Sequence, residues 1–133
     1  MQKILSVLVL VLISTSVYAR GDEEEQLLNT NSCVNCDLSN AWLEEANLRK
    51  ANLTGGKLYR ANMEYANLTG ANLNEADLNN IRLLGANLTN AILDNAILKY
   101  TYLRDANLSG SSLKGTKLRD ARFYNTKTDD VRF

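Results

Sequence analysis

Cys33 and Cys36 are the two residues whose type and spacing most directly suggest chemistry. A Cys-x-x-Cys pair acts as a redox centre when a helix N-terminus in a βαβ unit lowers the pKa of one thiol, and the sequence shows no such unit. Haem attachment needs a histidine at the next position, where this chain has Asp37. A zinc site would need two more ligands. Three interpretations remain: a structural disulfide, two buried free thiols, or thiol redox chemistry.

Other residues with catalytic potential are few. Histidine is absent, which removes the commonest general base and the commonest metal ligand. No glycine-rich phosphate loop or hydrolase elbow occurs. Lysine and arginine number 15, as do aspartate and glutamate, which argues against a strongly basic nucleic-acid binder. We therefore predict a protein that is not an enzyme and that uses no cofactor, no metal ion and no nucleic-acid ligand.

The N-terminus has the composition of an export signal. Lys3 precedes a short apolar run over residues 4–13, and small residues surround a Val-x-Ala end. This pattern predicts a signal peptide over residues 1–19 with cleavage after Ala19, and hence a periplasmic or extracellular protein. The alternative is an uncleaved anchor, but the apolar run is short for a bilayer core of about 30 Å. We expect no membrane span in the mature form.

A period of five residues dominates the rest of the chain. Every fifth position from Leu38 to Phe133 gives twenty sites, of which sixteen are leucine. Two positions before each site the residue is usually small, and twelve of the twenty are alanine. The repeating unit is A-N-L-x-x, as in residues 66–70 and 86–90. The positions that depart most from it are Ile81, Thr128 and Val131.

Neither regular element accommodates this period. Five residues on an α-helix turn about 500°, which would scatter the leucines around the circumference. On a continuous strand, alternate leucines would point to opposite faces. The pattern works if each quintet is a short extended piece followed by a corner, so that alanine and leucine always point inward. The sequence therefore predicts an all-β solenoid.

The number of quintets per turn is not fixed by the period alone. A turn of twenty residues stacks Asn47, Asn67, Asn87 and Asn107 in one outward column, whereas a turn of fifteen mixes different residue types. The uniform column favours twenty. On that basis the outward side chains sort onto four faces.

Residues 36–133 resemble the pentapeptide-repeat family, with an uninterrupted register of the unit described above. The resemblance implies a right-handed quadrilateral β-helix of about five 20-residue coils. The predicted export signal and the segment from Cys33 to Leu38 are similar to the opening of exported bacterial members.

The expected organisation is a signal peptide (1–19), an N-terminal lead-in and cap (20–35) and a β-helix (36–133). In this register Cys33 and Cys36 both point inward at one corner of the first coil, where an oxidising compartment favours a disulfide. Phe123 and Phe133 lie at inward positions of the last coils with nothing after them. We therefore predict a tail-to-tail homodimer through that end, as relatives form.

One of the four faces gathers aromatic and arginine residues, which are enriched at binding hot spots. We predict that it binds a partner; the alternative is that aromatic residues simply suit exposed β structure. This predicted face displays Trp42, Tyr65, Arg82, Leu84, Tyr102, Arg104, Arg122 and Tyr124.

The first expectation for function is an exported, non-catalytic scaffold that presents this face to another protein or to an envelope polymer. The resemblance also implies an alternative, because some members mimic DNA and bind gyrase. Mimicry requires negative potential, whereas residues 36–133 carry 13 basic and 11 acidic groups. The third and least favoured function is a thiol oxidoreductase using Cys33 and Cys36.

Overall fold

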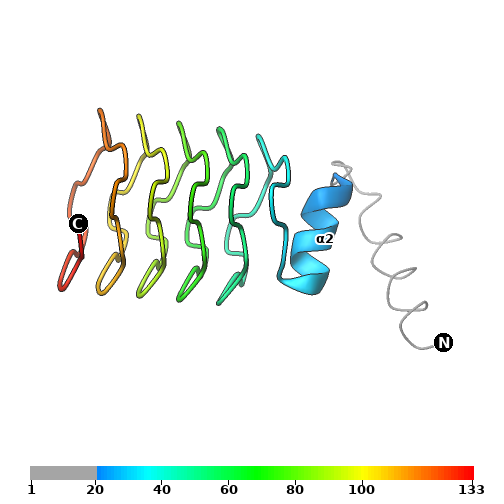
Figure 1. Cartoon of the computed structure of the whole chain (residues 1–133), viewed down its shortest axis with the longest axis horizontal. Coiled ribbons are helices and arrows are strands. Elements are labelled where there is room, and N and C mark those ends of the chain that lie inside the picture. Colours follow the sequence, from blue (N-terminus) through cyan, green and yellow to red (C-terminus); the bar gives the residue numbers. More distant parts are fainter. Residues whose placement is uncertain (1–20) are drawn as a thin grey trace.

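A computed structural model describes residues 21–133, and the predicted signal peptide lies outside these residues. Figure 1 shows a rod of successive coils with helix α2 (Asp22–Thr30) lying across its N-terminal end and the C-terminus at the other end. From residue 32 onward the chain repeats one bridged position and one two-residue turn in every five residues.

The turn explains why the unit has five residues. At each corner the residue two positions after the leucine adopts a positive φ, as Lys50 does (58°). The amide of the next residue closes the turn, as in the 3.0 Å bond that Ala51 N–H donates to Leu48 O. The asparagine before the leucine supports the same corner. The Asn67 Oδ1 atom accepts bonds from the Thr69 amide (3.1 Å) and hydroxyl (2.7 Å). Asparagine therefore recurs before leucine because its side chain caps the turn.

Successive coils are joined by a continuous parallel ladder. Every bridged pair is separated by 20 residues, from Ser32↔Asn52 to Ser112↔Arg132. Each junction uses bonds in both directions: Leu48 N–H donates to Asn67 O (2.8 Å), and Asn67 N–H donates to Ala46 O (2.9 Å). Four corners thus complete one coil, and the 20-residue alternative is the one found.

The core is a stack of leucine and alanine side chains along the axis. The leucines at every fifth position from Leu38 to Leu113 are at most 2% exposed, and Met63 takes the same place in its coil. Ile81 is also fully buried, and the ladder continues past it. Arg82 N–H donates to Ala61 O and Tyr102 N–H donates to Ile81 O, each at 3.1 Å. The bulky side chain is accommodated without loss of a ladder bond.

Helix α2 covers the N-terminal end of this core. Leu27 is fully buried against the first coil, and Leu28 packs beside it. The helix ends at Asn31, which has a left-handed conformation and donates its backbone N–H to Leu27 O at 2.8 Å. The lead-in was expected to cap this end, but a helix there was not anticipated.

Candidate functional site

The predicted aromatic face exists as one side of the rod. The bridges join Trp42, Asn62, Arg82, Tyr102 and Arg122 into one column, with one member from each coil. Trp42, Tyr65, Tyr102 and Tyr124 are all exposed, between 42% and 69%. Leu84 is half-buried at the middle of the face. All eight predicted residues therefore lie on this side, which we call the aromatic face.

In the N-terminal half of the aromatic face, Glu64 neutralises the arginine. Arg82 donates from Nε (2.8 Å) and Nη2 (2.6 Å) to the same Oε1 atom of Glu64, whose side chain is only 14% exposed. Glu44 also belongs to this half and accepts a bond from the Asn62 amide at 3.3 Å.

The Tyr65 ring lies close to Gly85, at the equivalent corner of the next coil. A Cβ atom at Gly85 would stand 2.5 Å from the Tyr65 ring, and Gly85 has a φ of +62°. Glycine at this position therefore makes room for the ring. The corner itself does not require glycine, because Lys50 adopts a similar φ at an equivalent corner.

The C-terminal half of the aromatic face carries two stacked pairs of arginine and tyrosine. The Arg122 guanidinium lies 5.1 Å from the centroid of the Tyr102 ring, and the Arg104 guanidinium lies 5.3 Å from that of Tyr124. These four residues line an open hollow of about 440 Å³. Arg104 also contacts its neighbour Asp105 at 3.3 Å, across a largely exposed pair. We call these four residues the C-terminal patch.

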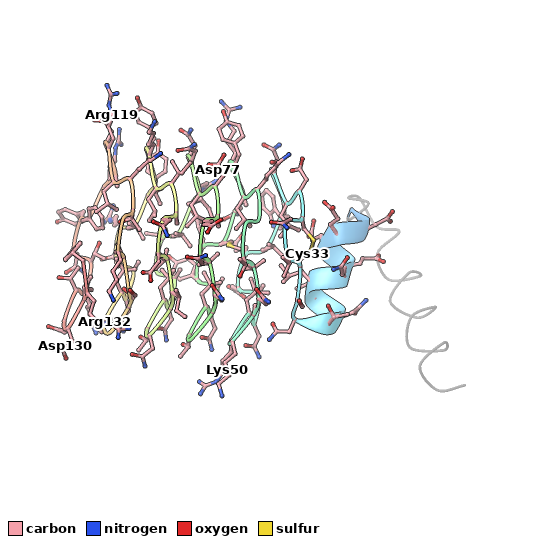
Figure 2. The ribbon with its side chains drawn as sticks, viewed as in Figure 1. Cys33, Lys50, Asp77, Arg119, Asp130 and Arg132 are labelled. Carbon is pink, nitrogen blue, oxygen red and sulfur yellow. A yellow bond between two sulfur atoms is a disulfide. The ribbon has the colours of Figure 1, made fainter. Side chains whose placement is uncertain are left out.

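Charge is distributed unevenly along the rod. Residues 21–80 contain ten acidic and four basic groups, whereas residues 81–133 contain five acidic and nine basic groups. Figure 2 shows Arg119 and Arg132 in the coils near the C-terminus, and Lys50 and Asp77 nearer the N-terminus. Mimicry of DNA would require negative potential along the whole rod, and residues 21–133 do not provide it.

Further aromatic residues lie outside the predicted face. The Arg60 guanidinium is 5.0 Å from the Tyr59 ring centroid, and Tyr100 is 48% exposed at a corner. Neither tyrosine belongs to the predicted face. Their positions in the five-residue register would have placed them on the neighbouring side.

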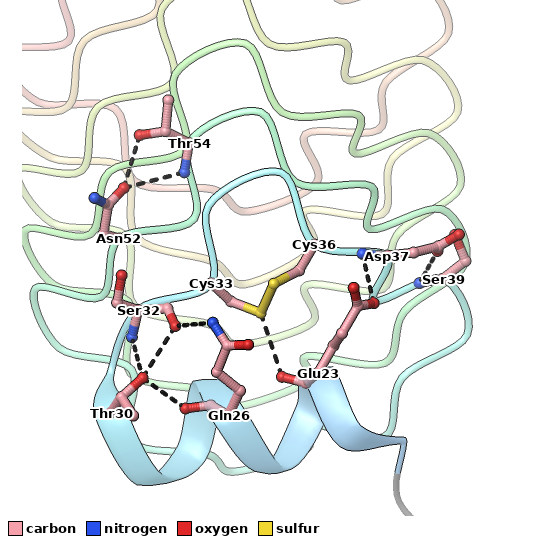
Figure 3. Close-up of a disulfide and its surroundings, with 10 residues drawn as sticks. All are labelled: Glu23, Gln26, Thr30, Ser32, Cys33, Cys36, Asp37, Ser39, Asn52 and Thr54. Atoms are coloured by element: carbon pink, nitrogen blue, oxygen red, sulfur yellow. Dashed lines mark hydrogen bonds between the residues drawn. A yellow bond between two sulfur atoms is a disulfide. The ribbon is translucent and has the colours of Figure 1, made fainter.

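Cys33 and Cys36 form a disulfide at a corner of the first coil (Figure 3), with Cα atoms 5.4 Å apart. Cys33 is 0% exposed and Cys36 is 6% exposed. The Sγ atom of Cys33 lies 3.3 Å from the Glu23 carbonyl oxygen, so helix α2 covers the disulfide. A buried disulfide offers no access to an attacking thiolate, which makes redox catalysis a poor fit to this geometry.

Side chains of the helix segment also cap the backbone edge beside the disulfide (Figure 3). Glu23 Oε2 accepts the Asp37 N–H at 2.7 Å, and Gln26 Nε2 donates to Ser32 O at 3.1 Å. Asp37 itself accepts a bond from the Ser39 N–H at 3.1 Å. Hydrogen bonds from the Ser39 side chain and then its backbone, with Lys57 nearby, hold the pKa of Asp37 below its usual value.

The C-terminal end has no such cover within the described residues. Phe123 and Phe133 occupy inward register positions, as expected, but they are 40% and 78% exposed because no later coil lies over them. In the preceding coil Leu103 N–H donates to Arg122 O at 3.0 Å, whereas the equivalent Phe123 N–H has no backbone acceptor in residues 21–133. This end therefore exposes both apolar side chains and an unpaired backbone edge.

Two other features of residues 21–133 bear on function. They contain no group of three or more histidine, cysteine, aspartate or glutamate side chains placed to hold a metal ion. Within the same range, no helix combines the length and apolar character that crossing a bilayer requires.

Comparison with solved structures finds similar rods. A pentapeptide-repeat protein, Rfr23, from the cyanobacterium Cyanothece 51142 is 29% identical, with a TM-score of 0.55 over 84% of this chain and 97% of that one. The pentapeptide-repeat protein alr5209 from Nostoc PCC 7120 is 22% identical, with a TM-score of 0.69 over 82% of this chain and 95% of that one. A comparison with curated proteins finds no match.

The family model for pentapeptide repeats (8 copies) matches three overlapping segments, residues 32–70, 66–99 and 96–127. These matches cover most of the described coils, and the ladder is the parallel β-helix that the structural relatives share. The chain therefore belongs to the pentapeptide-repeat family, whose fold is a right-handed β-helix.

Proposed function

We propose that this chain is an exported, non-catalytic scaffold that binds another protein through its aromatic face. The observation that carries the proposal is the exposure of Trp42, Tyr65, Tyr102 and Tyr124 on one side of a rigid rod. Arginine, tyrosine and tryptophan are enriched among the hot spots of protein interfaces. A regular ladder holds these side chains at fixed spacing, which reduces the ordering cost of binding.

Export rests on the sequence of residues 1–19, with its positive start, apolar run and small residues before the cleavage position. We propose that the mature protein begins at Arg20 and works in the periplasm or outside the cell. Mass spectrometry of the protein recovered from the native cell envelope tests this step. A protein that retains residues 1–19 would contradict it.

We also propose that two copies associate tail to tail. The open C-terminal end combines Phe123 and Phe133 with an unpaired backbone edge, and such edges pair readily with a second chain. The last twenty residues hold six basic and three acidic groups, so two such ends repel each other. The dimer should therefore strengthen with salt, which screens the repulsion.

Light scattering across a range of salt concentrations tests the dimer. Phe133→Arg should shift the protein to monomer, whereas Arg49→Ala, away from this end, should leave the mass unchanged. A monomer at micromolar concentration and high salt would overturn the tail-to-tail proposal.

The binding proposal is tested by affinity capture with the tagged protein from its own cell envelope. The double variant Trp42→Ala with Tyr102→Ala should lose the captured partner while its far-UV circular dichroism spectrum stays unchanged. The matched control is Tyr59→Ala with Tyr100→Ala, which removes two aromatic rings from the neighbouring side. Unaltered capture by the first variant would exclude the aromatic face.

A further inference from the structure

We infer that the C-terminal patch binds an acidic segment of a partner protein. This inference rests on the proposed function, because it states which kind of partner segment the aromatic face binds. It makes the aromatic face directional: the C-terminal half holds the acidic segment, and the N-terminal half does not.

The arginines of the two halves differ in their electrostatic pairing. Glu64 holds Arg82 through two short contacts, which leaves little positive charge in the N-terminal half. In the C-terminal patch, the only carboxylate that pairs with Arg104 among residues 21–133 is the exposed one of Asp105, and Arg122 has no carboxylate within 4.0 Å in the same range. A partner carboxylate therefore meets an available guanidinium in the C-terminal half.

The surrounding charge reinforces this difference. Residues 81–133 have an excess of four basic groups, whereas residues 21–80 have an excess of six acidic groups. The basic excess includes Lys99, Lys117 and Arg119 on the side next to the aromatic face. An acidic segment is consequently attracted to the C-terminal half of the rod and repelled from the other half.

The stacked geometry favours a carboxylate ligand. A guanidinium lying over a tyrosine ring is already oriented and retains N–H donors along its edges, where a carboxylate binds with two parallel bonds. The hollow between the two pairs has aromatic walls that accept the apolar part of a neighbouring side chain. A guanidinium covers one side of each tyrosine ring, so a sugar ring cannot stack on that side. These features favour a protein segment over an anionic polysaccharide.

Fluorescence anisotropy of the full chain with a labelled peptide of alternating glutamate and glycine tests the inference. The peptide should bind at low salt, release as salt rises, and bind much more tightly than its glutamine and lysine counterparts. Arg104→Gln with Arg122→Gln should weaken binding about tenfold. The matched control, Arg49→Gln with Arg60→Gln, removes the same charge and another arginine stacked on tyrosine, and should bind as the parent does.

Three results would overturn the inference: equal binding of the glutamine peptide, no effect of the Arg104 and Arg122 substitutions, or equal losses in the control variant. Preferential binding of alginate or polyphosphate over the glutamate peptide would also overturn it, in favour of a non-protein polyanion. If the glutamate peptide fails to bind but capture still depends on Trp42 and Tyr102, the proposed function stands and only the acidic assignment falls.

Discussion

The two ends of the rod present the same kind of backbone edge, but only the N-terminal edge is covered within the described residues. There α2 buries Leu27 on the core, and side chains of the helix segment bond to edge groups of the first coil. At the C-terminal end Phe133 is 78% exposed. Within residues 21–133, the chain itself covers the N-terminal end of the core, whereas the side chains and backbone edge at the C-terminal end stay exposed.

Together with the proposed tail-to-tail dimer, this difference leads us to expect that one end of the solenoid contributes mainly to stability and the other mainly to association. In a repeat fold each coil contacts only its neighbours, so a terminal coil depends on whatever covers it. Changes at the capped end should therefore alter the stability of the single chain. Changes at the open end should alter self-association instead.

The largest expected effect comes from removing the apolar contact of the cap. Leu27→Ala should lower the free energy of unfolding by about 2–5 kcal/mol, because it leaves a cavity beneath α2. Phe133→Ala should change it by less than about 0.5 kcal/mol in the monomer, because that side chain is already largely solvated. Urea unfolding followed by circular dichroism, at a protein concentration that gives monomer, measures both. Equal losses would remove the distinction between the ends.

A smaller effect should follow reduction of the disulfide. Cys33 and Cys36 are three positions apart, and closing so short a loop stabilises the folded chain by roughly 2 kcal/mol. Once reductant has reached the disulfide through transient opening of α2, hydrogen exchange should be faster in residues 22–40 and unchanged in residues 114–133. The variant Cys33→Ser with Cys36→Ser, which cannot respond to reductant, is the control. A uniform increase in the exchange rate along the rod would show that the disulfide stabilises the whole rod and not the N-terminal cap alone.

A single hydrogen bond of the cap contributes less again. Glu23→Ala removes the acceptor of the Asp37 N–H and should cost about 1 kcal/mol of stability. Glu25→Ala removes a charge from the same turn of α2 without removing that bond, so it separates the bond from the helix electrostatics. Similar losses in the two variants, measured by urea unfolding, would attribute the effect to charge alone.

The smallest expected effect is on the titration of Asp37. Its pKa is depressed in the folded chain, so its contribution to stability is present above its unfolded pKa of about 3.9 and is lost as pH falls through the folded pKa. Ser39→Ala should raise the pKa of Asp37 but leave it partly depressed, because the backbone bond remains. Carboxyl carbon NMR measures this change. An unaltered pKa would mean that the Ser39 hydroxyl makes no contribution.

The β-helix was predictable because the same five-residue pattern recurs in every coil. Small and leucine side chains alternate with a corner throughout the register, so the sequence predicts both the inward positions and the faces. Helix α2 was not predictable in this way. Its nine residues carry four consecutive acidic groups and only two leucines, and its burial depends on the core end that it meets.

The sequence predicted which residues lie on the candidate site, but not which of its arginines pairs with a carboxylate. The register placed Arg82, Arg104 and Arg122 on one face, but it could not show that Glu64 neutralises only the first of them. That contact depends on side-chain direction between adjacent coils. The charge gradient was hidden for a different reason: the overall composition balances to zero, and only separate counts for the two halves reveal it.

The twenty-residue ladder also constrains how the length of this chain can change. Every bridge joins residues 20 positions apart, so loss or gain of a whole coil would shorten or lengthen the rod and keep each column intact. Loss of a single quintet would instead rotate all later residues onto the next side. The aromatic column would then be split between two sides, although the leucines at every fifth position would still point inward. Insertions and deletions that preserve binding should therefore be multiples of 20 residues, which is one coil. Those that preserve the fold but not the aromatic column can be multiples of five residues, which is one quintet.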